Sequence, residues 1–516
     1  MSDLANIGWM GGLAIYQRVI GTLGSALFAR TLGATDFGVL TIVNTTTSSA
    51  YGLFRLSVDA SLQVEVASRP DRVQQTLPYV FAGMVLLGIA GALAWMAVLM
   101  SAKWVAGSVY GSAPIAPMLQ FAGPLVFAQC LCQFVYAVLA GANRFDIYAR
   151  WTMAVSTIGL ITSGAAAWWG NLQLVLMVMV VTQMINAVVL LRVLTVLIDW
   201  KAGIPSLSVS VVFAAARTLL RTGLPYYASG FVLIPVTYGL QGMLGQAGGI
   251  EAVGYQRILI AMCSVVGFLP HSIAGVVVSS LAAARGHGQP TDTIDRQAAI
   301  TLKLIWLATV IVAIAVIAAM PWLIGLLFGA PYLPATGPAR VACVAAVFAS
   351  VGQVGIQDSV AARRFGIVLK MAVVHAIVFL LLGVALIPEN LLFGYAIAEL
   401  AAHGCVLVAV LVEQRARYKG RRSALAACIV LTALLATSPL WFPSGAAAVA
   451  ISALVLEVIL GGLLFFVLFS DAERAVVLRR MSTILRKRRT GRVKGNATGL
   501  ADTTPLRRWP SGDPHA

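Results

Sequence analysis

Residues 6–47 read NIGWMGGLAIYQRVIGTLGSALFARTLGATDFGVLTIVNTTT, which describes a long apolar helix, a tight corner and the start of a second helix. The corner at residues 32–38 contains Gly33 and Gly38, and two glycines allow the chain to turn sharply at a membrane surface. Arg18 lies about midway along the first apolar run, where a charge costs ~2.5–3.5 kcal/mol unless it faces water or a partner. The stretch therefore predicts a hairpin of membrane-spanning helices that carries a functional arginine.

Beyond the corner the second helix continues with a polar run from Asn44 to Ser49. Six consecutive side chains point all around a helix, so they cannot all face lipid. A water-filled cavity inside a helical bundle is the simplest place for them.

Composition confirms the membrane class. The chain has 516 residues, of which 59% are hydrophobic and 11% charged, against roughly 25% charged in soluble proteins. The formal net charge is +17, but the basic residues lie mostly between hydrophobic spans and in the tail, which indicates topology rather than nucleic-acid binding. The six cysteines have neither zinc spacing nor a disulfide framework, and no Gly-rich nucleotide loop is present, so we expect no metal and no cofactor.

The apolar pattern predicts an all-α polytopic membrane protein with about fourteen spans of ~20 residues each. The first two are expected at residues 7–31 and 38–62. Placing the N-terminus in the cytoplasm puts most of the 36 Lys and Arg residues in cytoplasmic loops or the tail. Both termini are therefore expected in the cytoplasm.

The longest internal break divides the chain into two lobes. Its end alternates Phe213 and Leu219 with Arg217 and Arg221, as an interfacial helix requires. The tail is strongly basic at first, which favours contact with anionic membrane lipids, and then polar and disordered. The predicted organisation is a six-helix lobe (1–198), an interlobe loop with an interfacial helix (199–222), a second six-helix lobe (223–413), two extra helices (414–470) and the cytoplasmic tail (471–516).

Three sequence islands repeat in the same order at nearly constant spacing. Residues 107–114 match 325–332, residues 140–147 match 360–367, and Asp36 and Gly38 have counterparts in Glu251 and Gly254. Six helices separate equivalent positions, so the two lobes have the same orientation and are related by an axis along the membrane normal. This is the architecture of transporters with a central cavity.

The motifs at residues 29–38, residues 139–145 and Gly254-Tyr255 resemble the polysaccharide (Wzx-type) flippases of the multidrug/oligosaccharidyl-lipid/polysaccharide (MOP) exporter superfamily. The resemblance covers about residues 5–470. It implies translocation of an undecaprenyl-diphosphate-linked oligosaccharide for O-antigen, lipopolysaccharide or exopolysaccharide synthesis, by alternating access in the bacterial cytoplasmic (inner) membrane. A polysaccharide polymerase and export machinery are the implied partners. Relatives often carry an Asp-Arg pair where this chain has Leu240 and Gln241, so a role of that pair does not carry over.

Three arginines lie inside predicted spans: Arg18 near the midplane, Arg55 toward the cytoplasmic end and Arg257 toward the outer end. Guanidinium stays charged and binds phosphate oxygens in a bidentate fork, so this ladder could hand a diphosphate across the bilayer. The alternatives are internal salt bridges or contacts with lipid headgroups. Arg55 and Asp59 are four residues apart, which makes an ion pair a strong competitor for both.

Glu399 and Glu457 are further acids within spans, and each could be a coupling site for protons or sodium or the partner of an arginine. The histidines at 271, 375 and 403 fit hydrogen-bonded core positions as well as function. Four polar residues on the seventh span are candidate sugar contacts, although Tyr also packs at membrane interfaces. They are Tyr226, Tyr227, Tyr238 and Gln241.

Other functions remain open at this point. A lipid II flippase would share the cationic cavity, whereas a cation-coupled multidrug extruder would need an acidic and aromatic one. A membrane-embedded polysaccharide polymerase or ligase would generally need a large outer loop with catalytic groups, and every predicted outer loop is short. The sequence therefore favours a transporter over an enzyme.

Overall fold

The computed structural model describes residues 3–68, 73–142, 144–197, 208–268, 291–361 and 364–413. Within these ranges the chain is helical and has no strand. The two predicted C-terminal helices, the tail and Glu457 lie outside the described residues, as do residues 199–207 of the predicted interlobe loop. The rest of that loop, from residue 209, is the beginning of a long helix.

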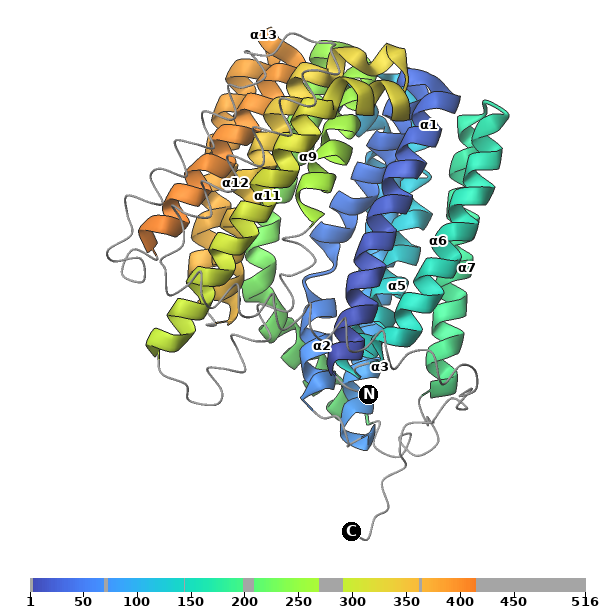
Figure 1. The fold of residues 1–516 in the computed structure, drawn as a ribbon. Coiled ribbons are helices and arrows are strands. Elements are labelled where there is room, and N and C mark those ends of the chain that lie inside the picture. Colours follow the sequence, from blue (N-terminus) through green and yellow to red (C-terminus); the bar gives the residue numbers. More distant parts are fainter. Residues whose placement is uncertain are drawn as a thin grey trace, which may run out of the picture.

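The first half of the chain forms a bundle of long helices, drawn blue to green in Figure 1. Short helical turns η1 (Val105–Val109), η2 (Ala113–Ile115) and α4 (Ala116–Leu119) link α3 to α5. The long helices are α1 (Asp3–Phe54), α2 (Val58–Ala67), α3 (Val73–Trp104), α5 (Ala122–Gly141), α6 (Phe145–Trp168) and α7 (Leu172–Leu197).

The second half lies beside the first and is drawn green to orange (Figure 1). Helix α9 packs against α1 and also against α12 and α13, so it joins the two halves. The helices are α9 (Val209–Val266), α11 (Thr291–Leu327), α12 (Thr336–Ala361) and α13 (Phe365–Glu413), with a short turn η4 (Ala330–Ala335) before α12.

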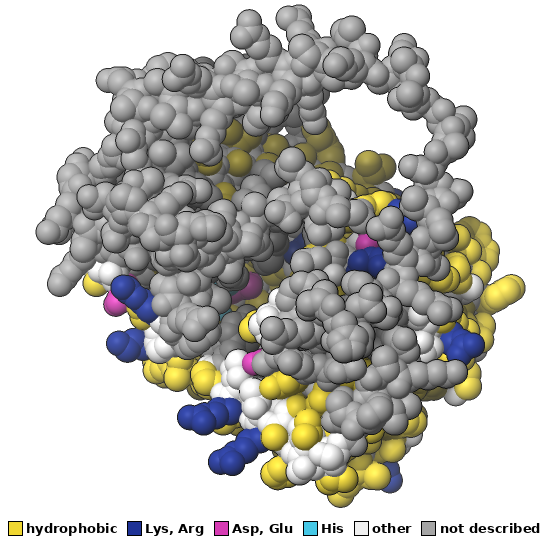
Figure 2. All heavy atoms as spheres, turned by 90° about the horizontal axis from the view of Figure 1, so that it is seen from below, with side chains coloured by type: hydrophobic (Ala, Val, Ile, Leu, Met, Phe, Trp, Pro, Cys, Tyr) yellow, Lys and Arg dark blue, Asp and Glu magenta, His cyan; other side chains and the backbone are white. Residues whose placement is uncertain are grey.

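Eight stretches of the described chain are long and apolar enough to cross a membrane. Three of them, within α1, α9 and α13, contain a reversal, so each supplies two antiparallel passes. The predicted all-α, multi-pass fold is thereby confirmed. We call the end of the bundle with the N-terminus the near side and the opposite end the far side (bottom and top of Figure 1). Basic side chains are visible around the near side (Figure 2).

The far-side turns reveal the internal repeat in the backbone. Gly33 reverses α1 with φ 78° and ψ 174°, and Gly249 reverses α9 with φ 74° and ψ 173°. Only glycine adopts this conformation without a steric penalty. The next turns use Gly111 and Gly329, both with positive φ, and a slightly larger spacing pairs Gly170 with Leu391 (φ 46°). The two halves therefore repeat turn by turn.

The predicted corner needs one correction. The chain turns at Gly33 alone, and Gly38 lies within the following helix. A methyl group at Gly38 would overlap the carbonyl oxygen of Ile250, and one at Gly254 would lie 2.8 Å from the carbonyl oxygen of Ala34. The two glycines are equivalent in the repeat, so each lets its helix approach the turn of the other half.

The second predicted span, residues 38–62, is also interrupted. Helix α1 ends at Phe54, and Leu56 and Ser57 adopt positive φ before α2 begins at Val58. The apolar pattern continues across this break, so the hydropathy of the sequence does not indicate it.

The close contact between the halves yields a test. Gly38→Ala must displace the backbone near Ile250, so we expect destabilisation by about 1–3 kcal/mol, as for overpacked interiors. Gly88→Ala is the control, because a methyl group there meets no atom within 4 Å. Thermal unfolding of the purified proteins measures both; equal melting temperatures for the two variants would refute the contact.

Candidate functional site

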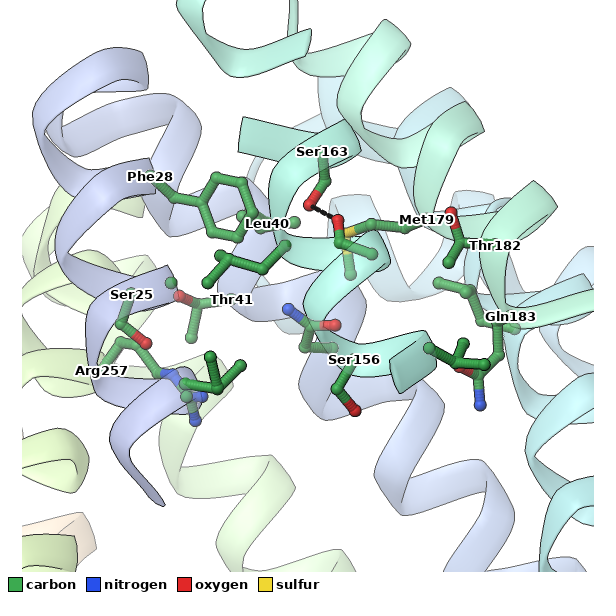
Figure 3. Close-up of a pocket in the computed structure, with 18 of the residues that line it drawn as sticks. Ser25, Phe28, Leu40, Thr41, Ser156, Ser163, Met179, Thr182, Gln183 and Arg257 are labelled. Atoms are coloured by element: carbon green, nitrogen blue, oxygen red, sulfur yellow. Dashed lines mark hydrogen bonds between the residues drawn. The ribbon is translucent and has the colours of Figure 1, made fainter. Parts of the chain in front are cut away.

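A cavity of about 290 Å³ lies inside the first half, between α1, α5, α6 and α7 (Figure 3). Its wall is apolar on the side of Phe28, Leu40 and Met179. The remaining lining is rich in hydroxyl and amide groups: Ser25, Thr41, Asn44, Ser156, Ser163, Thr182, Gln183 and Asn186. Such side chains can donate to phosphate oxygens or exchange hydrogen bonds with sugar hydroxyls.

Arg257 reaches this cavity from α9 of the second half and lies beside Ser25 and Thr41 (Figure 3). Within the described part of the chain its guanidinium has no hydrogen bond and no ion pair. A guanidinium that reaches a polar cavity without a carboxylate partner has its donors free for an anion.

Arg18 lies on the same face of α1 as the cavity. Gly21, Ser25 and Phe28 line the cavity, and they follow Arg18 by three, seven and ten residues, which is the spacing of one helix face. Because α1 runs from the near to the far side, Arg18 is about one turn nearer to the near side than Gly21. No other described side chain pairs with it.

Arg55 has a different environment, at the break between α1 and α2. Its Nη1 lies 2.7 Å from Oδ2 of Asp59, and its guanidinium carbon lies 5.1 Å from the centre of the Tyr51 ring. The hydroxyl of Tyr51 donates to the same Asp59 oxygen at 2.8 Å. The structure therefore places Arg257 in the lining of the cavity and Arg18 about one helical turn from it. Arg55 instead forms the ion pair with Asp59 that the sequence offered as the alternative to substrate binding.

The candidate sugar contacts lie mainly in a polar seam between the halves. Gln241 donates to Thr45 Oγ1 at 3.2 Å and to Gln256 Oε1 at 2.8 Å, and it accepts from the Tyr110 hydroxyl at 3.1 Å. Tyr238 hydrogen-bonds Thr46 at 2.8 Å. The side chains of Gln241 and Tyr238 are thus engaged in hydrogen bonds, several of which hold α9 against the first half.

The other two tyrosines lie elsewhere on α9. Tyr227 donates to the carbonyl oxygen of Leu53 at 2.6 Å, and the side chain of Tyr226 is outside the described set. Sequence reasoning overlooked Gln256 and the polar lining of α6 and α7. The signal for this lining is the presence of polar residues inside otherwise apolar spans. Ser156, Ser163 and Asn186 are examples.

The halves are also tied together at the far side, by two equivalent sets of hydrogen bonds. Arg30 donates to the carbonyl oxygens of Leu326 and of Leu327, the latter at 2.9 Å. Its repeat equivalent, Gln246, donates to those of Ser108 and Val109 at 2.6 and 3.0 Å. Both sets bind the end of the helix that precedes the second far-side turn of the opposite half, so together they join the two halves at the far side.

Comparison with known proteins gives the family. A family model described as "Polysaccharide biosynthesis protein" matches residues 27–337. The chain belongs to this family. The resemblance stated from the motifs is thus confirmed, and no curated protein matches the sequence.

The polysaccharide-biosynthesis family member shares its fold with solved MOP-type transporters. The lipid II flippase MurJ in an inward closed conformation has a TM-score of 0.63 at 12% identity, with 91% of this chain and 99% of MurJ covered. The eukaryotic MATE transporter AtDTX14 has a TM-score of 0.62 at 13% identity, covering 88% and 98%. A MOP superfamily transporter from Pyrococcus furiosus has a TM-score of 0.53 at 12% identity, covering 81% and 99%. The protein therefore has the multi-pass membrane fold that these transporters share.

The Arg55–Asp59 pair gives the second test. Arg55→Ala leaves the buried Asp59 carboxylate without its cation, so we expect a loss of about 1.5–3 kcal/mol, measured as reduced thermal stability. Arg55→Ala/Asp59→Asn removes both charges and should restore much of the stability and the transport. A double variant that is stable but inactive would assign Arg55 to substrate binding instead.

The far-side hydrogen bonds of Arg30 and Gln246, which we call the far-side ties, give the third test. Arg30→Ala/Gln246→Ala removes hydrogen bonds that contribute on the order of 0.5–3 kcal/mol each, so the open population should rise at least about tenfold. Spin labels at Trp169→Cys and Glu389→Cys, on exposed far-side turns of the two halves in a background without native cysteines, report the distance between them. Arg144→Ala, which breaks a pair at the other side of the bundle, is the control. An unchanged distance distribution in the double variant would show that these bonds do not hold the far side.

Proposed function

We propose that this protein moves an undecaprenyl-diphosphate-linked oligosaccharide from the inner to the outer leaflet of the bacterial cytoplasmic membrane. The near side is then cytoplasmic, with both termini there. The substrate is carried without chemical change, so the protein acts as a flippase rather than an enzyme. A polymerase and export machinery would take over the product.

The guanidinium of Arg257 supports this proposal most directly, because it lines a cavity of hydroxyls and amides and has no hydrogen bond or ion pair among the described residues. A diphosphate needs a permanent cation while it crosses the membrane interior, and the adjoining sugars need hydrogen-bond partners. Arg18, one turn toward the near side, offers a second cationic position on the path. The two arginines come from different halves, so relative motion of the halves would change the distance between them.

The cavity charge also bears on the rival transporters. Its described lining holds a cation and no carboxylate, which is unfavourable for the organic cations of a multidrug extruder. Its volume is at the low end of the roughly 300–1,000 Å³ found for small-ligand sites. A whole oligosaccharide therefore requires further separation of the halves on the near side.

The lipids of a strain that lacks the gene reveal the substrate. In a strain lacking the gene, mass spectrometry of the lipid extract should show accumulated diphosphate-linked oligosaccharide, which the wild-type gene clears. Arg257→Gln and Arg18→Gln should clear it about 10- to 100-fold more slowly, because each loses a charge-assisted contact of about 1.5–3 kcal/mol. Arg192→Gln, at an exposed position of α7, should behave as wild type.

The outcomes separate the functions. Accumulation of lipid II would assign the peptidoglycan precursor as substrate. If no lipid-linked sugar accumulates and sensitivity to organic cations rises, the polysaccharide proposal fails. If the lipid accumulates and both arginine variants clear it normally, the cavity assignment fails while the function stands.

A further inference from the structure

An apolar groove of about 810 Å³ lies toward the near side of the first half, between α3 and the beginning of α9. Phe81, Val85 and Leu86 of α3 form one wall, and Val212 and Phe213 of α9 belong to the other. The groove shares no lining residue with the polar cavity described above. It is therefore a second, separate site in the described part of the chain.

The beginning of α9 packs as part of the first half. Ala215 and Leu219 are buried, and they form one apolar cluster with Val58 and Leu62 of α2 and Leu77 of α3. The remaining buried members of this cluster all belong to helices of the first half. Both walls of the groove thus lie in the same half, so separation of the two halves need not open it. Such a site suits a resident ligand better than a transported one, which must be released when the halves separate.

The groove opens onto an exposed apolar surface of α3. Val85 is followed by Ile89, Leu93 and Met96, which are all exposed and lie three or four residues apart, on one face of the helix. The same helix is among the described stretches that are long and apolar enough to cross a membrane. An exposed apolar stripe on such a helix faces the hydrocarbon chains of the bilayer. A lipid chain can therefore enter the groove directly from the membrane.

The α9 wall of the groove also carries positive charge. Val209, Phe213 and Arg217 follow one another at intervals of four residues, so apolar and cationic side chains share one face of α9. Arg217 lines the groove, and Arg221 is exposed one turn beyond it. Neither arginine has a hydrogen bond or an ion pair among the described residues, and the described lining contains no carboxylate. This arrangement matches a ligand with a hydrocarbon chain and an anionic head.

We propose that this groove binds one anionic glycerophospholipid of the near-side leaflet as a resident of the protein. An acyl chain lies between α3 and α9, where the lining is apolar. The phosphate accepts hydrogen bonds from the guanidinium of Arg217, and Arg221 adds a second positive charge. An anionic lipid is preferred to a zwitterionic one, because a zwitterionic head brings an ammonium group that the two arginines repel.

The bound lipid fixes the beginning of α9 against the first half. Two residues after Arg221, a methyl group at Gly223 would lie 2.9 Å from the carbonyl oxygens of both Leu56 and Ser57. Those two residues form the break between α1 and α2. The helix that holds the lipid is thus in backbone contact with this break, and lipid binding should raise the melting temperature of the protein. The site does not depend on the identity of the transported substrate.

Native mass spectrometry of the purified full-length protein in detergent tests the charge. The protein is titrated with phosphatidylglycerol or with phosphatidylethanolamine of the same acyl chains, and the dissociation constant of the first bound copy is measured. The wild type should bind phosphatidylglycerol at least about fivefold more tightly, because an arginine near an anionic head contributes ~1 kcal/mol. Arg217→Gln should lose about fivefold in affinity for phosphatidylglycerol alone. Arg192→Gln, an exposed arginine toward the near end of α7, is the control and should bind as wild type.

A second pair of variants tests the groove itself. Val85→Trp places a large ring at the exposed edge of the groove and should remove the tightly bound copy. Ile89→Trp, one turn further along the same exposed face and outside the groove, should keep it. Phosphatidylglycerol with a photoreactive diazirine in its acyl chain should label the peptide that contains residues 81–86.

The results are decisive in either direction. Equal affinity for the two lipids, or wild-type binding of phosphatidylglycerol by Arg217→Gln or Val85→Trp, would refute the site. If undecaprenyl phosphate displaces phosphatidylglycerol and binds more tightly, the groove holds the tail of a transported lipid instead of a resident one. A dimer that Val85→Trp dissociates would make the groove an interface between two copies of the chain. None of these outcomes depends on whether lipid-linked sugar accumulates in the strain that lacks the gene.

Discussion

The close approach of α1 and α9 at the far side is the contact on which the rest of the structure depends. Gly38 and Gly254 have no side chain at the point where each helix meets the turn of the other half. The two backbones can therefore come into contact across the repeat axis. In lipid the hydrophobic effect does not drive helices together, so close packing at small residues supplies much of the free energy of helix association. The cavity, the polar seam and the far-side ties all lie along helices whose relative position these glycines set.

The interface between the halves is suited to opening as well as closing. Toward the middle it is held by the hydroxyls and amides of Thr45, Tyr110, Gln241 and Gln256. These groups can replace their hydrogen bonds to each other with hydrogen bonds to water. The free-energy cost is modest, because a typical hydrogen bond contributes only about 0.5–1.5 kcal/mol net. A seam of large apolar side chains would also close the path, but it would expose its surface to water whenever the halves separate.

Much of the fold could be predicted from the sequence. Spans follow from apolar length, and the repeat followed from islands such as residues 107–114 and 325–332, which proved to hold the equivalent turns at Gly111 and Gly329. The role of Gly38 could not be predicted, because glycine in a corner and glycine at a helix crossing look alike until the partner helix is placed. For the same reason the sequence identified Arg18, Arg55 and Arg257 as a set. Only the packing separates Arg55, which pairs with Asp59, from Arg257, which lines the cavity, and Arg18, which lies about one turn from it.

The spacing that relates Gly33 to Gly249 makes Thr35 the repeat equivalent of Glu251, which corrects the pairing of Glu251 with Asp36 made from the sequence. Thr35 donates a hydrogen bond to Glu251 at 3.0 Å. They therefore meet at the axis that relates the two halves. In a dimer of identical chains, the residue at such a place faces a copy of itself, so a glutamate would meet a glutamate and the two charges would repel. A single chain with two unlike halves escapes that restriction and can set a donor against an acceptor. Fusion of the repeats thus permits a complementary contact at a position where exact symmetry would forbid it.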